Sequence, residues 1–148
     1  MKSRAFGILV LAVTLAAALV PFLDRHAELP IWQHHLLHAG LLAGGALAGV
    51  FITARARGSQ VGSAFWLVPA LLAPMVAMFA MWPSAYSYFE VHPYGHVLEH
   101  LVLIALAYLA TASAESYAAG LGWIVGGAMF FMAVAAARGF GVTFGNGG

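Results

Sequence analysis

Six of the chain's seven histidines fall in two short clusters whose spacing suits a helix with several imidazoles on one side. In the first cluster His34 and His38 are four residues apart, so in an α-helix they share a face, about 40° apart and one turn from each other. His35 lies about 60° from His38, at the edge of that face. Imidazole binds a metal through one ring nitrogen while the other is held by a neighbouring group. This cluster predicts metal ligands at His34 and His38, with His35 as a further candidate.

The second cluster combines His92, His96 and His100, spaced four apart, with the carboxylate of Glu99. On a helix these residues form one polar stripe about 100° wide. Glu99 and His100 lie about two turns, or about 10 Å, along it. Ionisable groups at such depth in a membrane persist where they pair, face the bundle interior or carry out chemistry. We therefore predict His96 and His100 as metal ligands and Glu99 as a ligand or neighbouring base. His92 is a further candidate at the outer edge.

Several kinds of site remain open for these side chains. Two helices that each present a histidine pair could bind a metal ion, and copper, zinc and iron all accept imidazole. They could also provide the two axial ligands of haem b. The chain has no cysteine, which excludes thiolate sites and disulfides. A structural polar network and a proton relay are the other interpretations, and His26 suits a membrane headgroup contact. The methionines spaced three apart would suit Cu(I) or fill gaps in the core: Met75, Met78 and Met81.

Apolar helices must position these residues. The chain has 148 residues, of which 63% are hydrophobic and 7% are charged, whereas a soluble domain carries about 25% charged residues. A membrane-spanning helix needs about 20 apolar residues, and the apolar blocks cover residues 6–23, 31–53, 62–82, 92–111 and 117–137. We predict a single all-α domain over residues 1–148, a polytopic transmembrane helix bundle of about five spans. The first block is interpreted as a retained helix rather than a cleaved signal.

Lysine and arginine in the short loops predict the orientation of this bundle, because cytoplasmic loops carry more of them. The larger group is Lys2, Arg4, Arg55 and Arg57, and the smaller group is Arg25 and Arg138. The N-terminus is therefore predicted to be cytoplasmic, with both histidine clusters near the outer face of a prokaryotic inner membrane. Glycines four apart within residues 31–53 and 117–137 predict close helix packing. A net charge of +1 provides no basic field for nucleic acid.

Two segments carry a resemblance to a known family: His34-His35-Leu36-Leu37-His38 and His96-Val97-Leu98-Glu99-His100-Leu101. They are similar to the histidine-rich helix start and the His-x-x-Glu-His helix of the CtaG-type cytochrome oxidase assembly proteins. The segment Trp82-Pro83-Ser84-Ala85-Tyr86 resembles that family's Trp-His-x-Pro-x-x-Tyr segment, but the histidine between Trp and Pro is absent here. The likeness covers about residues 31–112. The family is usually longer and has more spans, so this chain resembles a reduced form.

The resemblance implies a membrane copper-binding protein, not itself an enzyme, that assists assembly or metallation of a respiratory haem–copper oxidase. Its expected partners are membrane lipid and such an oxidase. Two other functions remain open from the residues themselves. One is a small b-type haem or quinone-linked electron-transfer protein. The other is a non-catalytic accessory subunit of a respiratory membrane complex, with the histidines in a structural network.

Overall fold

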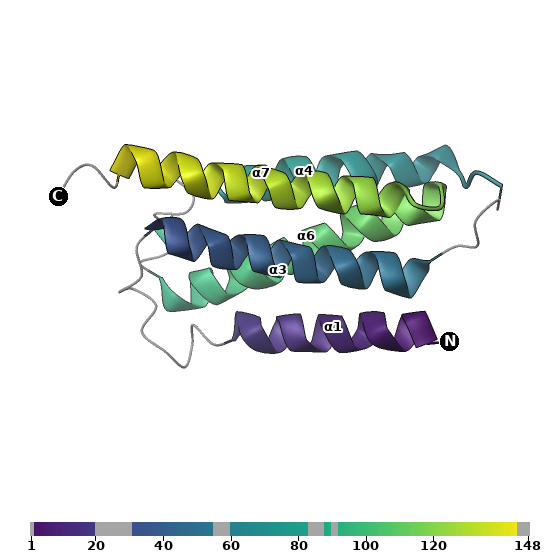
Figure 1. Ribbon diagram of the computed structural model, residues 1–148, viewed down its shortest axis with the longest axis horizontal. Helices are drawn as coiled ribbons and strands as arrows, with labels where there is room; N and C mark the ends of the chain where they lie inside the picture. The colour runs from purple at the N-terminus through teal and green to yellow at the C-terminus, as the bar shows by residue number, and fades with distance from the viewer. Residues whose placement is uncertain (1, 20–30, 55–59, 83–87, 90–91, 145–148) are drawn as a thin grey trace.

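The described part of the chain is a bundle of α-helices without strands. The computed structural model describes residues 2–19, 31–54, 60–82, 88–89 and 92–144. Within them the α-helices lie side by side and successive ones run in opposite directions (Figure 1). They are α1 (Lys2–Ala18), α3 (Ile31–Thr53), α4 (Leu67–Ala80), α6 (Pro93–Tyr117) and α7 (Leu121–Phe144), and a 3-10 helix, η2 (Ala64–Trp66), precedes α4. The predicted all-α helix bundle is confirmed.

The surface of the bundle is that of a membrane protein. The segments Gln33–Thr53, Tyr94–Tyr117 and Leu121–Arg138 are long and apolar enough to cross a bilayer, and Ser3–Ala18 and Ala64–Ala80 are shorter apolar helices. Large apolar side chains point outward on α4 and α7, including Leu71, Phe79, Ile124 and Phe131. An apolar surface this extensive is costly in water and favourable against lipid tails. These features identify a membrane protein.

The helix boundaries agree with the predicted ones best at α3, which covers residues 31–53 as expected. In contrast, α6 continues to Tyr117 although its predicted end was residue 111, and α7 begins only at Leu121. The polar residues near the end of α6 suggested a break, but they are buried within the bundle. Thr111 Oγ1, for example, donates to the Ala107 carbonyl oxygen at 2.8 Å and contacts the Ala46 carbonyl oxygen at 3.0 Å. A helix tolerates such residues where backbone carbonyls accept their hydrogen bonds.

Two other elements differ from their predicted extents. Helix α1 already begins at Lys2 and ends at Ala18, and residues 20–30, including His26, lie outside the described residues. The third apolar block begins as η2, and α4 starts only at Leu67. Pro69 therefore falls in the first turn of α4, where its missing N–H is not needed. Pro74 alone lies in the interior of that helix.

The central contact of the bundle joins α3 and α6, which run in the same direction (Figure 1). Glycines on α3 make it close. A Cβ atom added at Gly45 would lie 2.5 Å from the Ile104 carbonyl oxygen and 3.2 Å from the Ala107 Cβ. In lipid, such close backbone approach supplies the van der Waals contact that holds helices together. Because the two helices are parallel, their N-terminal ends lie at the same end of the bundle. The end where α3 and α6 begin and α1 finishes is called the histidine end below.

Candidate metal centre

Four histidine side chains converge at the histidine end. The Nε2 atoms of His34 and His38 are 3.0 Å apart, those of His96 and His34 are 2.9 Å apart, and those of His100 and His38 are 3.0 Å apart. All of these ligand atoms lie within 4.8 Å of one another, and each residue is buried. His34, His38, His96 and His100 are together called the four-histidine ring. Each of them was predicted as a ligand from sequence.

The imidazoles are arranged as a slightly puckered square. Ring centroids around the perimeter are 4.6 Å apart for His34–His38, 4.9 Å for His38–His100, 4.5 Å for His96–His100 and 4.7 Å for His34–His96. The two diagonals are longer, at 5.9 Å for His34–His100 and 6.3 Å for His38–His96. A tetrahedron would make all these separations equal. The four-histidine ring is therefore closer to a square than to a tetrahedron.

Neutral imidazoles cannot satisfy all three short contacts with a separate proton each. Every nitrogen–nitrogen contact needs one N–H and one lone pair. The contacts run from His96 to His34, then to His38, then to His100, so donors and acceptors must alternate along this series. The donor among the two middle residues, His34 or His38, would then share a single N–H between two acceptors. A cation at the centre would accept the lone pairs of all four Nε2 atoms together. The arrangement therefore suits a bound metal ion better than a network of neutral hydrogen bonds.

The register between α3 and α6 brings the two histidine pairs into contact. His34 meets His96 and His38 meets His100, in each case 62 residues further along the chain. The same separation of 62 residues relates Gly45 to Ala107, further along the contact between α3 and α6. Gly45 can approach the α6 backbone because it has no side chain. The close contact of Gly45 with α6 thus sets the register that aligns the histidines. The contact between α3 and α6 around Gly45 is called the glycine seam below.

Helix α1 contributes the neighbour of one ligand. The Nδ1 atom of His100 lies 3.4 Å from the carbonyl oxygen of Ala18, in the last turn of α1. An Nδ1–H that donates to this oxygen leaves the lone pair on Nε2, which faces the ring. Ala18 itself is fully buried, against Leu41 and Ile104. This contact was not predicted from sequence, because an alanine carbonyl carries no recognisable signal.

The remaining predicted candidates take different positions. His35 is fully buried, and its ring centroid lies 5.6 Å from that of His38 in an edge-to-face arrangement. Glu99 is also buried, at 2% exposure. Neither belongs to the group of converging ligand atoms. Their predicted roles as a further ligand and as a ligand or neighbouring base remain predictions.

His92 lies outside the four-histidine ring, where α6 begins. It is exposed, its ring stacks on Tyr88 with centroids 4.7 Å apart, and its Nδ1 lies 2.8 Å from the Tyr88 carbonyl oxygen. With a proton on Nδ1, the Nε2 lone pair is available on the exposed side. His92 is one helical turn before His96. This position suits a residue that contacts a metal before it reaches the buried ring.

A haem would need a different arrangement of these side chains. Its macrocycle lies between two axial imidazoles, yet here His34 contacts His96 and His38 contacts His100 through their Nε2 atoms. The facing rings would have to separate to admit a macrocycle. A single metal ion requires no such movement.

No known family model, no curated protein and no solved structure matches this chain. The resemblance to the CtaG-type assembly proteins therefore rests on the segments quoted above.

Proposed function

We propose that this chain is a copper-binding protein of a prokaryotic inner membrane that assists assembly or metallation of a respiratory haem–copper oxidase. The copper ion would be held by the four-histidine ring, with the histidine end at the outer face. The convergence of four buried Nε2 atoms within 4.8 Å is the observation that carries the proposal. The oxidase as recipient comes from the family resemblance.

The square outline of the ring favours copper over zinc. Zinc sites are tetrahedral with Zn–N bonds of about 2.0–2.1 Å, which separates neighbouring nitrogens by about 3.3 Å. A square site with bonds of the same length separates them by about 2.9 Å. Three of the six nitrogen–nitrogen separations in the ring, at 2.9 and 3.0 Å, are close to the square value. Tetragonal nitrogen sites are typical of Cu(II) and Ni(II), and copper binds imidazole more tightly than nickel does.

Glu99 would balance the charge of the bound ion. Four neutral imidazoles leave the full charge of a copper ion inside an apolar bundle, which is costly without a counter-charge. Glu99 is buried at 2% exposure and precedes His100 on α6. Glu99 is three residues after His96 and directly before His100, so its carboxylate is the acidic group nearest to these two ring histidines along α6. We assign it the role of a compensating charge near the ring.

The same geometry suits transfer rather than catalysis. His96 is the most exposed of the four ring histidines, at 8%. The exposed His92 precedes it by one helical turn, at the start of α6. Copper could pass between these two residues by exchanging one imidazole for another. A buried ring with one more accessible side protects the ion yet permits release to a partner.

The first test is the metal content of the purified, detergent-solubilised chain, together with its electron paramagnetic resonance spectrum. We expect near-stoichiometric copper, and an oxidised spectrum with splitting from several nitrogens. His96→Ala should lose this copper, whereas His92→Ala, a histidine change on the same helix, should retain it. Near-stoichiometric iron with haem absorbance would instead identify the b-type cytochrome, and absence of metal after copper loading would overturn the site.

The second test concerns the recipient. In a host that lacks this chain, we expect the oxidase to contain less copper and to lose activity, with both restored by the wild-type chain or by added copper. The His96→Ala chain should not restore them. Normal oxidase copper in the absence of the chain would reject the assembly function while leaving the metal site intact.

A further inference from the structure

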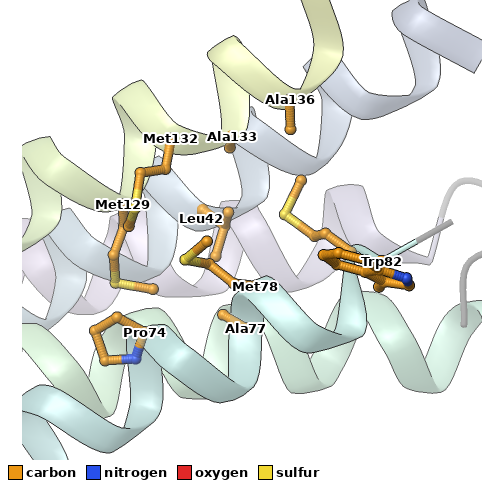
Figure 2. A pocket seen from close by; sticks show the side chains of 10 residues that line it. Leu42, Pro74, Ala77, Met78, Trp82, Met129, Met132, Ala133 and Ala136 are labelled. Carbon is orange, nitrogen blue, oxygen red and sulfur yellow. The ribbon is translucent and has the colours of Figure 1, made fainter. Parts of the chain in front are cut away.

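A second region of the bundle has the chemistry of a soft metal site. A half-open pocket of about 330 Å³ lies between α4, α7 and Leu42 of α3. It is lined in part by the thioethers of Met78, Met81, Met129 and Met132. These residues, with Trp82 and Leu42 in the same wall, are called the methionine pocket. Figure 2 shows Met78 and Trp82 on the α4 side facing Met129 and Met132 of α7 across this space.

The composition of the pocket limits what it could bind. None of its lining residues has a carboxylate, an imidazole or a hydroxyl group, so Mg²⁺, Ca²⁺ and Zn²⁺ would find no preferred ligand there. Thioether sulfur is a soft ligand that selects Cu(I). The indole of Trp82 adds an aromatic face, which attracts cations. Thioethers and an aromatic ring together favour a soft, singly charged ion.

Four methionines line the pocket, two from each side, whereas a single flexible methionine would be enough to fill a gap in the core. Met78 lies in the last turn of α4 and Met81 is the residue that follows the end of that helix, whereas Met129 and Met132 are three apart within α7. Residues three apart lie on the same side of a helix. Met78 and Met132 remain 54% and 37% exposed, whereas Met81 and Met129 are 7% and 3% exposed. Two sulfur-bearing side chains thus lie at the opening of the pocket and two lie deep inside.

We propose that the methionine pocket binds Cu(I) through its thioether sulfurs, as a site separate from the four-histidine ring. Leu42, in its wall, is one helical turn after His38 on α3. The pocket therefore adjoins the ring without sharing a side chain with it. Binding of Cu(I) here is independent of the proposed function, whereas a role as a second station for copper within the bundle would rest on it.

The experiment is an anaerobic Cu(I) titration of the full-length protein against a Cu(I) chelator, with X-ray absorption at the copper edge. We expect the wild-type chain to bind one Cu(I) more than its histidine-bound ion and to show copper–sulfur scattering. The double variant Met78→Leu and Met132→Leu should lose that additional ion, because leucine preserves volume but removes sulfur. His96→Ala should retain the copper–sulfur signal.

Met75→Leu is the matched control, because Met75 is exposed on α4 three residues before Met78 but does not line the pocket. It should bind as wild type does, and an equal loss in this variant would overturn the assignment to the pocket. A second measurement needs no substitution at all. In the selenomethionine protein the copper signal should shift from sulfur to selenium neighbours. Absence of both signals would overturn the proposal that the pocket binds Cu(I).

Discussion

Both ends of the bundle bury polar side chains, but these contact different kinds of group. At the end opposite the histidines, Glu115 Oε2 accepts hydrogen bonds from the backbone N–H groups of Gly120 at 2.9 Å and Gly122 at 3.3 Å. Thr111 there lies 3.0 Å from the carbonyl oxygen of Ala46. At the histidine end, imidazoles contact other imidazoles through atoms of the same type.

The difference separates a structural polar site from a candidate binding site. A carboxylate that accepts backbone N–H groups at the start of a helix satisfies donors that would otherwise lack partners. Such a contact closes the turn between α6 and α7, and its chemistry is complete within the protein. The four Nε2 atoms lie within 4.8 Å of one another and make three contacts that neutral imidazoles cannot each supply with a separate proton, whereas one cation could accept all four lone pairs. Burial of a polar side chain therefore does not by itself indicate a binding site. The kind of atom that the buried side chain contacts does.

The largest effect is expected for His38→Ala. His38 contacts two ring neighbours, His34 and His100, each at 3.0 Å, so its loss opens the ring at an inner position. We expect copper affinity to fall by about a hundredfold or more, since even changes to groups that support a ligand cost about 10–100-fold. A chelator competition titration measures this fall, and circular dichroism should show unchanged helix content. Affinity within a few-fold of wild type would remove His38 from the site.

Gly45→Ala should damage the seam that aligns the two histidine pairs. The new Cβ would lie 2.5 Å from the Ile104 carbonyl oxygen, a backbone atom that cannot move aside alone. We expect a loss of about 1–3 kcal/mol in stability, the usual cost of overpacking, together with weaker copper binding. Thermal unfolding in detergent and the same titration measure both. Gly40→Ala is the control, because nothing lies within 4 Å of its added Cβ, and equal behaviour of the two variants would contradict the seam.

Glu99→Gln should reduce copper binding sharply, by about tenfold, while the chain still inserts in the membrane. Glutamine keeps the shape of the side chain but removes the negative charge that we assign to balance the ion. The expected size is that of changes to groups around a metal ligand. Titration with Cu(II) and Cu(I) separately sharpens the result, because the doubly charged ion should lose more. Unchanged metal content in Glu99→Gln and His96→Ala together would rule out the site.

The smallest effect is expected for Glu115→Ala, which tests the structural end of the comparison. Loss of a helix-capping acceptor costs about 1 kcal/mol, because the N–H groups of Gly120 and Gly122 lose their carboxylate partner. Copper affinity should remain that of wild type, since the residue lies at the other end of α6. A lower unfolding temperature with an unchanged copper titration would support a purely structural role for Glu115. A change in copper binding as large as that of His38→Ala would contradict that role.

Much of the candidate site could be predicted from the chain because helix geometry is local. Spacing of four residues is enough to put His34 beside His38, and His96 beside His100, whatever surrounds them. The apolar length of residues 31–53 is likewise enough to predict α3. The end of α6 was harder, since Thr111 reads as a polar break until the carbonyl oxygen of Ala46 is known to lie 3.0 Å away.

The contacts between helices were not predictable in the same way. Sequence alone put His35 at the edge of the helix face and left it as a further candidate ligand, because which side of a helix meets its neighbour is not a local property. Met129 and Met132 carried no signal until α7 was positioned opposite α4 across the methionine pocket. Ala18 contributes through its backbone, and every residue has a carbonyl group.

The sequence by itself determined a membrane helix bundle and two helices with histidine stripes, because hydropathy and periodicity act within one segment. The predicted orientation already put both histidine clusters near the same membrane face. Only the tertiary structure decided that α3 and α6 pack against each other with the same 62-residue separation at both histidine pairs. That register depends on Gly45 meeting the α6 backbone, a contact between segments far apart in the chain. The physical reason is that side-chain direction is a local property of a helix, whereas convergence on one point requires two helices to be fixed relative to each other.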